Sequence, residues 1–356
     1  MRKLPVFLGV VFMAIGSAVS AQEANSTAPM QMSSWGDATQ SESMDYIPDV
    51  LLDMRTSYNH DFTEGAGGFG ATGLYLDING YLTPSLSYSI NHILCASYFD
   101  TMPTGFGATQ WLNLTYETGD FSITAGKLSL NVGSYEYDAD VLDQYFDMCS
   151  GFYNMFDCYQ WGMAAGWDPS ENHSFSLQVV NSPLATAASQ FGYNLGWRGE
   201  CGWYKPYWTV NLWQYDKGRY MTGLNFANRL TFGGFSCDLE YMARAAGMKG
   251  MFKDDFNVIA LPSYRIGEWF RVFGKCGWEH TTADLPYDLT YEETKGSDFI
   301  YYGAGVEFFP FKEDRDVRIH AIWTSNNFGM NLLDIGVRWK MNMTKMVKSI
   351  LSRNRQ

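Results

Sequence analysis

Acidic side chains are concentrated between residues 131 and 157, which we call the acidic segment. Tyrosines and phenylalanines separate these acids and would be costly to leave in water. We therefore expect the segment to fold inward and to narrow an aqueous path. Its carboxylates would then line that path, and their like charges would add to one negative electrostatic potential. The alternative is an ordinary exposed loop. The acids that we expect beside this path are Glu136, Asp138, Asp140, Asp143 and Asp147.

Basic residues occupy alternate positions of extended runs elsewhere in the chain, opposite the apolar positions. Alternation places this set toward water: Arg55, Lys127, Arg229, Arg244, Arg271, Lys275, Arg318, Arg338 and Lys340. Several lie on the last four runs, so they could form a basic arc facing the acidic segment. Facing walls of opposite charge would order polar solutes and exclude apolar ones. We expect Lys127 and Arg271 to be the constriction cations.

A simpler alternative is that the basic residues only keep the interior wet and pair with acids on neighbouring runs. The acids available for such pairs are Asp53, Asp77, Asp238, Glu240, Glu307 and Asp334.

Cysteines and histidines show none of the spacings that enzymes and metal sites use. The sequence has no C-x-x-C pair, no H-E-x-x-H and no G-x-S-x-G. We therefore predict no enzyme, no metal and no cofactor. Cys149 and Cys158 lie in one predicted loop region, and an oxidising compartment would allow a disulfide between them.

The elements that must position these charges are β-strands. In RLTFGGFSCDLEYMA (229–243), two alternating runs flank Gly233-Gly234, which suits a tight hairpin turn. Leu230 and Phe232 share a face with the apolar residues of the second run, whereas the other face is polar and charged. A strand pair with these two faces is typical of a wall between lipid and water.

Such runs recur about sixteen times between residues 47 and 342, which predicts an all-β, antiparallel, up-and-down transmembrane barrel. Short links alternate with longer ones, and an even count leaves both chain ends on the short-turn, periplasmic rim. A soluble β-sandwich also alternates, but its strands need no acidic and basic residues along one full side. The longer predicted links are 59–70, 99–108, 131–157, 183–191 and 281–296.

The ends of the chain differ from the barrel. Residues 1–21 have a basic start, a short apolar stretch and small residues up to Ala21, as in a secretory signal peptide. Residues 22–46 are polar and predict a flexible periplasmic leader. Residues 343–356 predict a basic periplasmic tail, either a short helix or a frayed end.

Composition excludes one class of partner and favours another. The net charge of −13 argues against nucleic acid, which requires a basic surface. Aromatic residues make up 17% of the chain, and tyrosine and tryptophan favour membrane–water interfaces. We therefore expect outer-membrane lipid as a partner.

The stretch SITAGKLSLNVGSYEYDADVLDQYFDMCSGFYNMFDCYQWG (122–162) resembles the segment after the fifth strand in outer-membrane porins of Bacteroides-type bacteria, the phosphate-selective porin O and P family. Further similar pieces are NSPLA (181–185), YNLGWRG (193–199), GVEFFPFKEDRDVRIHA (305–321) and LDIGVRWK (333–340). The resemblance implies a sixteen-stranded, usually trimeric porin of the outer membrane, with a long loop folded into the channel.

The sequence lacks the feature that phosphate selectivity requires, which is a cluster of cations along the channel. It has no dense run of arginine or lysine. We therefore expect passive diffusion of small hydrophilic solutes and ions. The alternatives are an anion- or phosphate-selective channel and a closed barrel acting as an adhesin or scaffold.

Overall fold

The computed structural model describes residues 46–96, 105–146, 156–282, 298–311 and 315–353, together with residues 286 and 296. The predicted signal peptide, nearly all of the predicted leader, Asp147 and Cys149 lie outside the described residues, as does part of the predicted tail.

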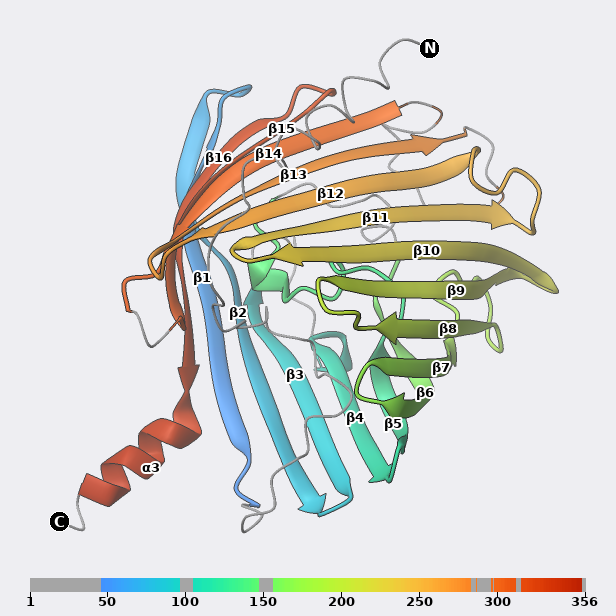
Figure 1. Cartoon of the computed structure of the whole chain (residues 1–356), viewed down its shortest axis with the longest axis horizontal. Helices are drawn as coiled ribbons and strands as arrows, with labels where there is room; N and C mark the ends of the chain where they lie inside the picture. The colour runs from blue at the N-terminus through green and yellow to red at the C-terminus, as the bar shows by residue number, and fades with distance from the viewer. Residues whose placement is uncertain are drawn as a thin grey trace.

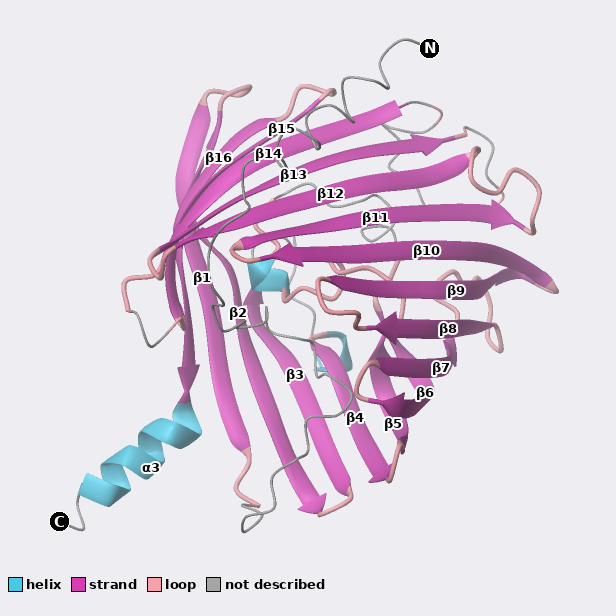
Figure 2. Ribbon diagram, in the orientation of Figure 1, coloured by secondary structure: helices cyan, strands magenta, loops and turns pink. Residues whose placement is uncertain are grey.

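In the described part of the chain, sixteen strands form one closed barrel in which each strand pairs with its sequence neighbours and β16 pairs with β1 (Figures 1 and 2). Every pairing is antiparallel, as predicted. The strands are β1 (Asp49–Asp61), β2 (Ala66–Thr83), β3 (Leu86–Ala96), β4 (Thr109–Thr118), β5 (Phe121–Ser129), β6 (Tyr159–Ser170), β7 (His173–Asn181), β8 (Phe191–Gly199), β9 (Tyr204–Asp216), β10 (Arg219–Phe232), β11 (Phe235–Ala246), β12 (Asp255–Ile266), β13 (Phe270–Thr281), β14 (Asp298–Phe308), β15 (Val317–Asn326) and β16 (Asn331–Asn342).

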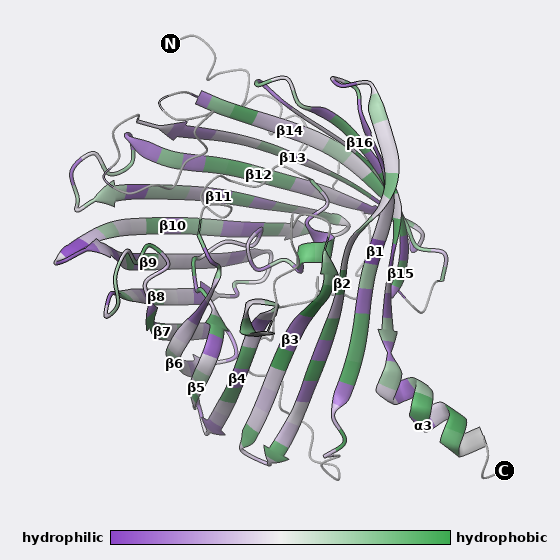
Figure 3. Ribbon diagram, turned by 180° about the vertical axis from the view of Figure 1, so that it is seen from behind, coloured by the Kyte–Doolittle hydropathy of each residue, from purple (hydrophilic) through white to green (hydrophobic). Residues whose placement is uncertain are grey.

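Alternating side chains give the barrel wall two different faces. On β5, Phe121 is 57% exposed whereas Ser122 is 8% exposed, and the alternation continues through Ile123 and Thr124. Hydrophobic and hydrophilic residues alternate along many strands in Figure 3. Large apolar side chains cover the outer face, and the buried polar side chains point inward, as a closed barrel in lipid requires.

The predicted hairpin at Gly233-Gly234 is confirmed. Phe232 pairs with Phe235, and Gly233 has a φ of 57°, a conformation that glycine adopts without steric cost. The predicted link 59–70 is wrong, because β1 and β2 extend to a turn at residues 62–65. This part of β2 cannot be recognised from the sequence because four of residues 65–70 are glycines. A residue without a side chain contributes nothing to the alternation of apolar and polar side chains.

Two polar residues on the outer face have local explanations. The pairing of β3 with β4 shifts register between Asn91 and His92, which marks a bulge. Asn228 accepts hydrogen bonds from Tyr204 Oη at 2.7 Å and from Trp208 Nε1 at 3.1 Å. These two hydrogen bonds satisfy the Asn228 side chain on the outer face. Tyrosine and tryptophan with polar tips of this kind are typical of the bilayer interface.

The chain continues beyond β16 as helix α3 (Met343–Arg353), so of the two conformations predicted for this tail the helix is the one that forms. None of the helices within the described ranges combines the length and apolar character that crossing a bilayer demands.

Candidate functional site

The acidic segment leaves the end of β5 and lies against inward-facing residues of many strands. Asn131 Nδ2 donates to Ser176 Oγ on β7 at 2.5 Å. The carbonyl of Val132 accepts hydrogen bonds from Thr209 on β9, at 2.8 Å, and from Asn225 on β10. The side chains of Thr209 and Asn225 thus satisfy a backbone carbonyl of the segment for which no strand partner is present among the described residues.

Four of the five predicted acids lie in the described part of the segment, and each forms an ion pair with the barrel wall. Glu136 pairs with Lys275 on β13, and Asp138 with Arg198 on β8. Asp140 lies 2.9 Å from Arg338 on β16. Asp143, in the short helix η2 (Val141–Asp143), lies 2.6 Å from Arg318 on β15 and also pairs with Arg338.

Arg338 connects the largest group of these charges. Its side chain is 0% exposed, and its Nε donates to Asp53 Oδ1 at 3.0 Å while its other nitrogens pair with Asp140 and Asp143. Lys340 lies 3.3 Å from the same Asp53 carboxylate. Buried charges require partners of this kind, because an unpaired ion in low dielectric is very costly.

A second ionic group lies beside the first, on β1, β15 and β16. Arg55 Nη2 lies 2.7 Å from Asp334 Oδ2, and His320 Nε2 lies 2.8 Å from Asp334 Oδ1. Arg55 also donates to the carbonyl of Gln144 at 3.2 Å, so the wall holds the backbone of the acidic segment here. The Tyr145 ring lies 4.8 Å from the His320 ring.

Apolar contacts also attach the segment to the wall. Leu142 is fully buried in a cluster with Tyr75 of β2 and Ile93 of β3. Phe146 packs against Phe273 and lies where a side chain on Gly303 would be, since a β-carbon there would come within 2.6 Å of the ring. A glycine at 303 therefore leaves room for the segment.

The pKa values of the segment's acids differ in direction. Burial raises the pKa of Asp138 and of Asp140 above the ordinary value, although Arg198 and Arg338 oppose the effect. Burial also disfavours ionised Asp143, but Arg338 and Arg318 outweigh it and hold the pKa of that carboxyl below its ordinary value. Of these three acids, Asp143 is thus the one whose charge the wall favours most.

Four of the six predicted acids of the wall, Asp53, Asp238, Glu307 and Asp334, pair with basic residues, as in the simpler alternative. Asp77 instead accepts a hydrogen bond from Asn91 at 2.6 Å, and Glu240 accepts one from the Glu136 amide at 2.9 Å. Arg229 binds Asp238 through two hydrogen bonds, of 2.6 and 2.8 Å, and Arg271 Nε lies 2.5 Å from Glu307. Arg244 pairs with Asp255 and Glu279, which the sequence analysis did not name. The acids and cations are therefore in contact and do not face each other across a gap.

The predicted inward position of Lys127 is wrong. Lys127 pairs in register with Leu112 and Trp161, whose face is the outer one, and its Nζ donates to the carbonyls of Phe106 (3.1 Å) and Thr109 (2.8 Å). Leu128, next to it, belongs to a buried interior cluster with Trp213 and Met221. Alternation predicts the wrong face for Lys127 because its apolar neighbour Leu128 points inward. The barrel interior is apolar at this place, where the acidic segment begins.

The outer position of Lys127 can be tested by substitution. We expect Lys127→Met to leave the ion preference of the protein unchanged and to lower the free energy of unfolding by about 1–3 kcal/mol, because the carbonyls of Phe106 and Thr109 lose this donor. Reversal potentials and chemical unfolding measure the two effects. A change in ion preference as large as that of a matched Arg271→Met variant would contradict the outer position.

Arg198 is a further wall cation, outside the set predicted from the sequence. It pairs with Asp138, and its guanidinium carbon lies 3.7 Å from the centre of the Tyr207 ring. Alternation with Tyr193, Leu195 and Trp197 was a sufficient signal. Asp147 and Cys149 lie outside the described residues, so the Asp147 role and the Cys149–Cys158 disulfide stay predictions.

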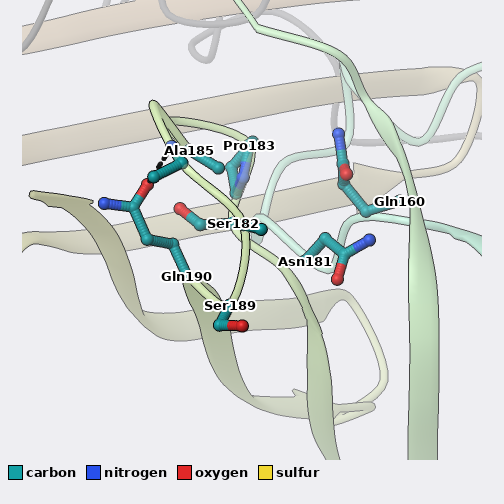
Figure 4. Close-up of a pocket in the computed structure, with 9 residues that line it drawn as sticks. Gln160, Asn181, Ser182, Pro183, Ala185, Ser189 and Gln190 are labelled. Atoms are coloured by element: carbon teal, nitrogen blue, oxygen red, sulfur yellow. Dashed lines mark hydrogen bonds between the residues drawn. The ribbon is translucent and has the colours of Figure 1, made fainter.

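A pocket of about 470 Å³ lies between β6 and the β7–β8 connection (Figure 4). Two of its polar side chains are engaged by the protein itself: Gln190 Oε1 accepts from the backbone of Thr186 and Ala187 within the connection, and Ser182 Oγ donates to the Gln214 carbonyl on β9. In the described residues, no group of three or more His, Cys, Asp and Glu side chains could hold a metal ion.

No protein-family model and no curated protein matches the chain. Solved structures do. The anion-selective porin from Comamonas acidovorans has a TM-score of 0.60 at 9% identity, over 83% of this chain and 99% of that one. The fold is that of the bacterial porins. OmpT of Vibrio cholerae without loop L8 has a TM-score of 0.59 at 14% identity, and a mutant Rh. blastica porin 0.55 at 12%, each over 83% of this chain and 100% of its own.

Proposed function

We propose that this protein is an outer-membrane porin through which small hydrophilic solutes and ions diffuse passively. One observation carries the proposal: a closed barrel with an apolar outer face has an inner face of charged and polar side chains. Such a wall fits a protein that separates lipid from water and conducts through its centre. The porin fold supports the bacterial outer membrane as its location.

The acidic segment is the element we assign to the constriction. Its described part contacts inward-facing residues of β7 to β11, of β13 to β16 and of β1 and β2, so it crosses much of the barrel's inner circumference. Its acids and the wall cations neutralise each other in contact, which leaves a weaker transverse field than separate charged walls would produce. Weak ion preference is the consequence.

A homotrimer is the proposed assembly. The resemblance to phosphate-selective porins O and P implies it, and a trimer form is known for the similar OmpT of Vibrio cholerae, whose structure covers 83% of this chain with a TM-score of 0.53 at 12% identity.

An anion- or phosphate-selective channel is the second candidate. The resemblance and the similarity to an anion-selective porin favour it. Arg198 and Arg271, whose side chains are 42% and 29% exposed, are the wall cations best placed to meet a passing anion. The pairing of the basic residues, these two included, weakens this candidate, because a guanidinium held by carboxylates has fewer donors left for phosphate.

Planar lipid bilayers test these proposals. We expect discrete ion-conducting steps, and in a salt gradient we expect Arg271→Glu to move the reversal potential toward cation preference and Asp140→Lys toward anion preference. Reversal potentials unchanged in both variants would refute the constriction assignment. A barrel that inserts but shows no ion steps would instead support the adhesin or scaffold alternative.

A further inference from the structure

Helix α3 presents an apolar stripe that is open to solvent. Met346, Val347, Ile350 and Leu351 are between 45% and 55% exposed. Their spacing of three and four residues places them on one side of a helix. A stripe of this kind is the face that an amphipathic helix buries against a partner.

The charge of α3 is opposite to that of the whole chain. The helix contains Lys345, Lys348 and Arg353 and no acidic residue, whereas the chain carries a net charge of −13. Lys345 and Lys348 are exposed. Basic residues beside an apolar stripe fit a surface that is both anionic and apolar, which is the composition of a membrane with acidic phospholipids.

The start of α3 is fixed at the rim of the barrel. Asn342 Oδ1 accepts a hydrogen bond from the Lys345 amide at 2.8 Å and so caps the helix. Thr344 Oγ1 accepts from the Val50 amide at 3.0 Å and donates to the Pro48 carbonyl at 2.8 Å. The helix therefore begins where the barrel wall ends, close to the outward-facing Trp339 of β16.

The helix projects away from the wall from this start in both orientations shown (Figures 1 and 3). A groove of about 450 Å³ separates α3 from the end of the barrel, and its lining combines two lysines and one aspartate with apolar side chains. Such a groove could receive a lipid headgroup together with the first part of an acyl chain. Its lining includes Asp316, Lys340, Lys345, Met346, Ser349 and Ile350.

We propose that α3 is a lipid-binding helix that lies on the membrane surface at the short-turn rim of the barrel. Its apolar stripe enters the boundary between headgroups and acyl chains, and its lysines bind the phosphates of acidic phospholipids. The inference rests on the proposed function only in that it requires the barrel to stand in a membrane. An isolated helix of 11 residues is marginal in water, so lipid contact would also stabilise it.

Amide hydrogen exchange of the full-length protein in nanodiscs tests the proposal. One nanodisc contains phosphatidylcholine alone, and the other contains roughly one-third phosphatidylglycerol. We expect the amides of residues 346–351 to exchange at least about tenfold more slowly in the anionic nanodisc, because each basic residue near such a surface strengthens binding about fivefold. Amides of the barrel strands report whether each sample is folded.

Variants separate the two contributions. Lys345→Glu combined with Lys348→Glu should remove the difference between the nanodiscs, and Val347→Ser combined with Ile350→Ser should remove protection in both. Lys217→Glu, an exposed charge in the β9–β10 turn, is the matched control and should change nothing.

Three outcomes would overturn the proposal: equal protection in both nanodiscs, no protection in either, or protection that rises with protein concentration in detergent, which would mean that α3 packs on a second copy. Conductance of the same preparations is measured separately. A silent barrel with a protected α3 would refute the proposed porin function and leave this inference standing.

Discussion

The double variant Asp140→Asn/Asp143→Asn is expected to conduct roughly twice as well as the parent protein, with larger current fluctuations. Both acids attach the acidic segment to Arg318 and Arg338, and the amides keep the side-chain shape while removing the charge. A segment that is held less firmly should sample more open positions. The cations left behind should also move the reversal potential toward anion preference.

The single variants should differ in size. Asp143→Asn should have the larger effect, because its two arginines hold the pKa of Asp143 below the ordinary value, whereas burial raises the pKa of Asp140. Asp216→Asn, at an exposed pair with Arg219, is the control and should behave like the parent. Unchanged single-channel conductance and noise in the double variant would show that these ion pairs do not hold a constriction.

Arg338→Met is expected to be the most destabilising single change in the barrel interior. Removing this fully buried cation leaves the carboxylates of Asp53, Asp140 and Asp143 with Lys340 and Arg318 as their remaining ion-pair partners among the described residues. Breaking a buried ion pair on one side costs about 3–5 kcal/mol, since an uncompensated charge remains. Chemical unfolding of the purified barrel in detergent micelles measures this loss.

Arg229→Met provides a matched comparison, because Arg229 also lies on the inner wall but forms its ion pair with one acid, Asp238. Both side chains are partly exposed, at 20% and 14%, and water can replace part of the pair, so we expect a loss of about 1 kcal/mol. Restoring neutrality with Arg338→Met/Asp53→Asn should recover part of the stability. Equal losses for Arg338→Met and Arg229→Met would mean that the ionic group around Arg338 is not cooperative.

Alternation in the sequence was sufficient to predict the barrel itself. In the hairpin around Gly233-Gly234 the side-chain period of two and the turn residues are both local properties, so they can be read without any knowledge of distant residues. The same signal failed at residues 65–70, where glycines carry no side chain, and β2 is longer than predicted for that reason.

The candidate site was only partly predictable. Acids in the acidic segment and cations on the wall could be named from the sequence, but their partners could not, because Asp140 and Arg338 are 198 positions apart and meet only when β16 closes against β1. Lys127 was misplaced because Leu128 next to it packs against the interior cluster instead of lipid.

The sequence by itself therefore determined the wall of this protein, its two faces and the charges it carries, since each depends on neighbours one or two positions away. Only the tertiary structure decided which charges touch. Closing the barrel brings strands from both ends of the chain beside one connecting segment, and in that confined interior the cost of leaving an ion unpaired selects the partners.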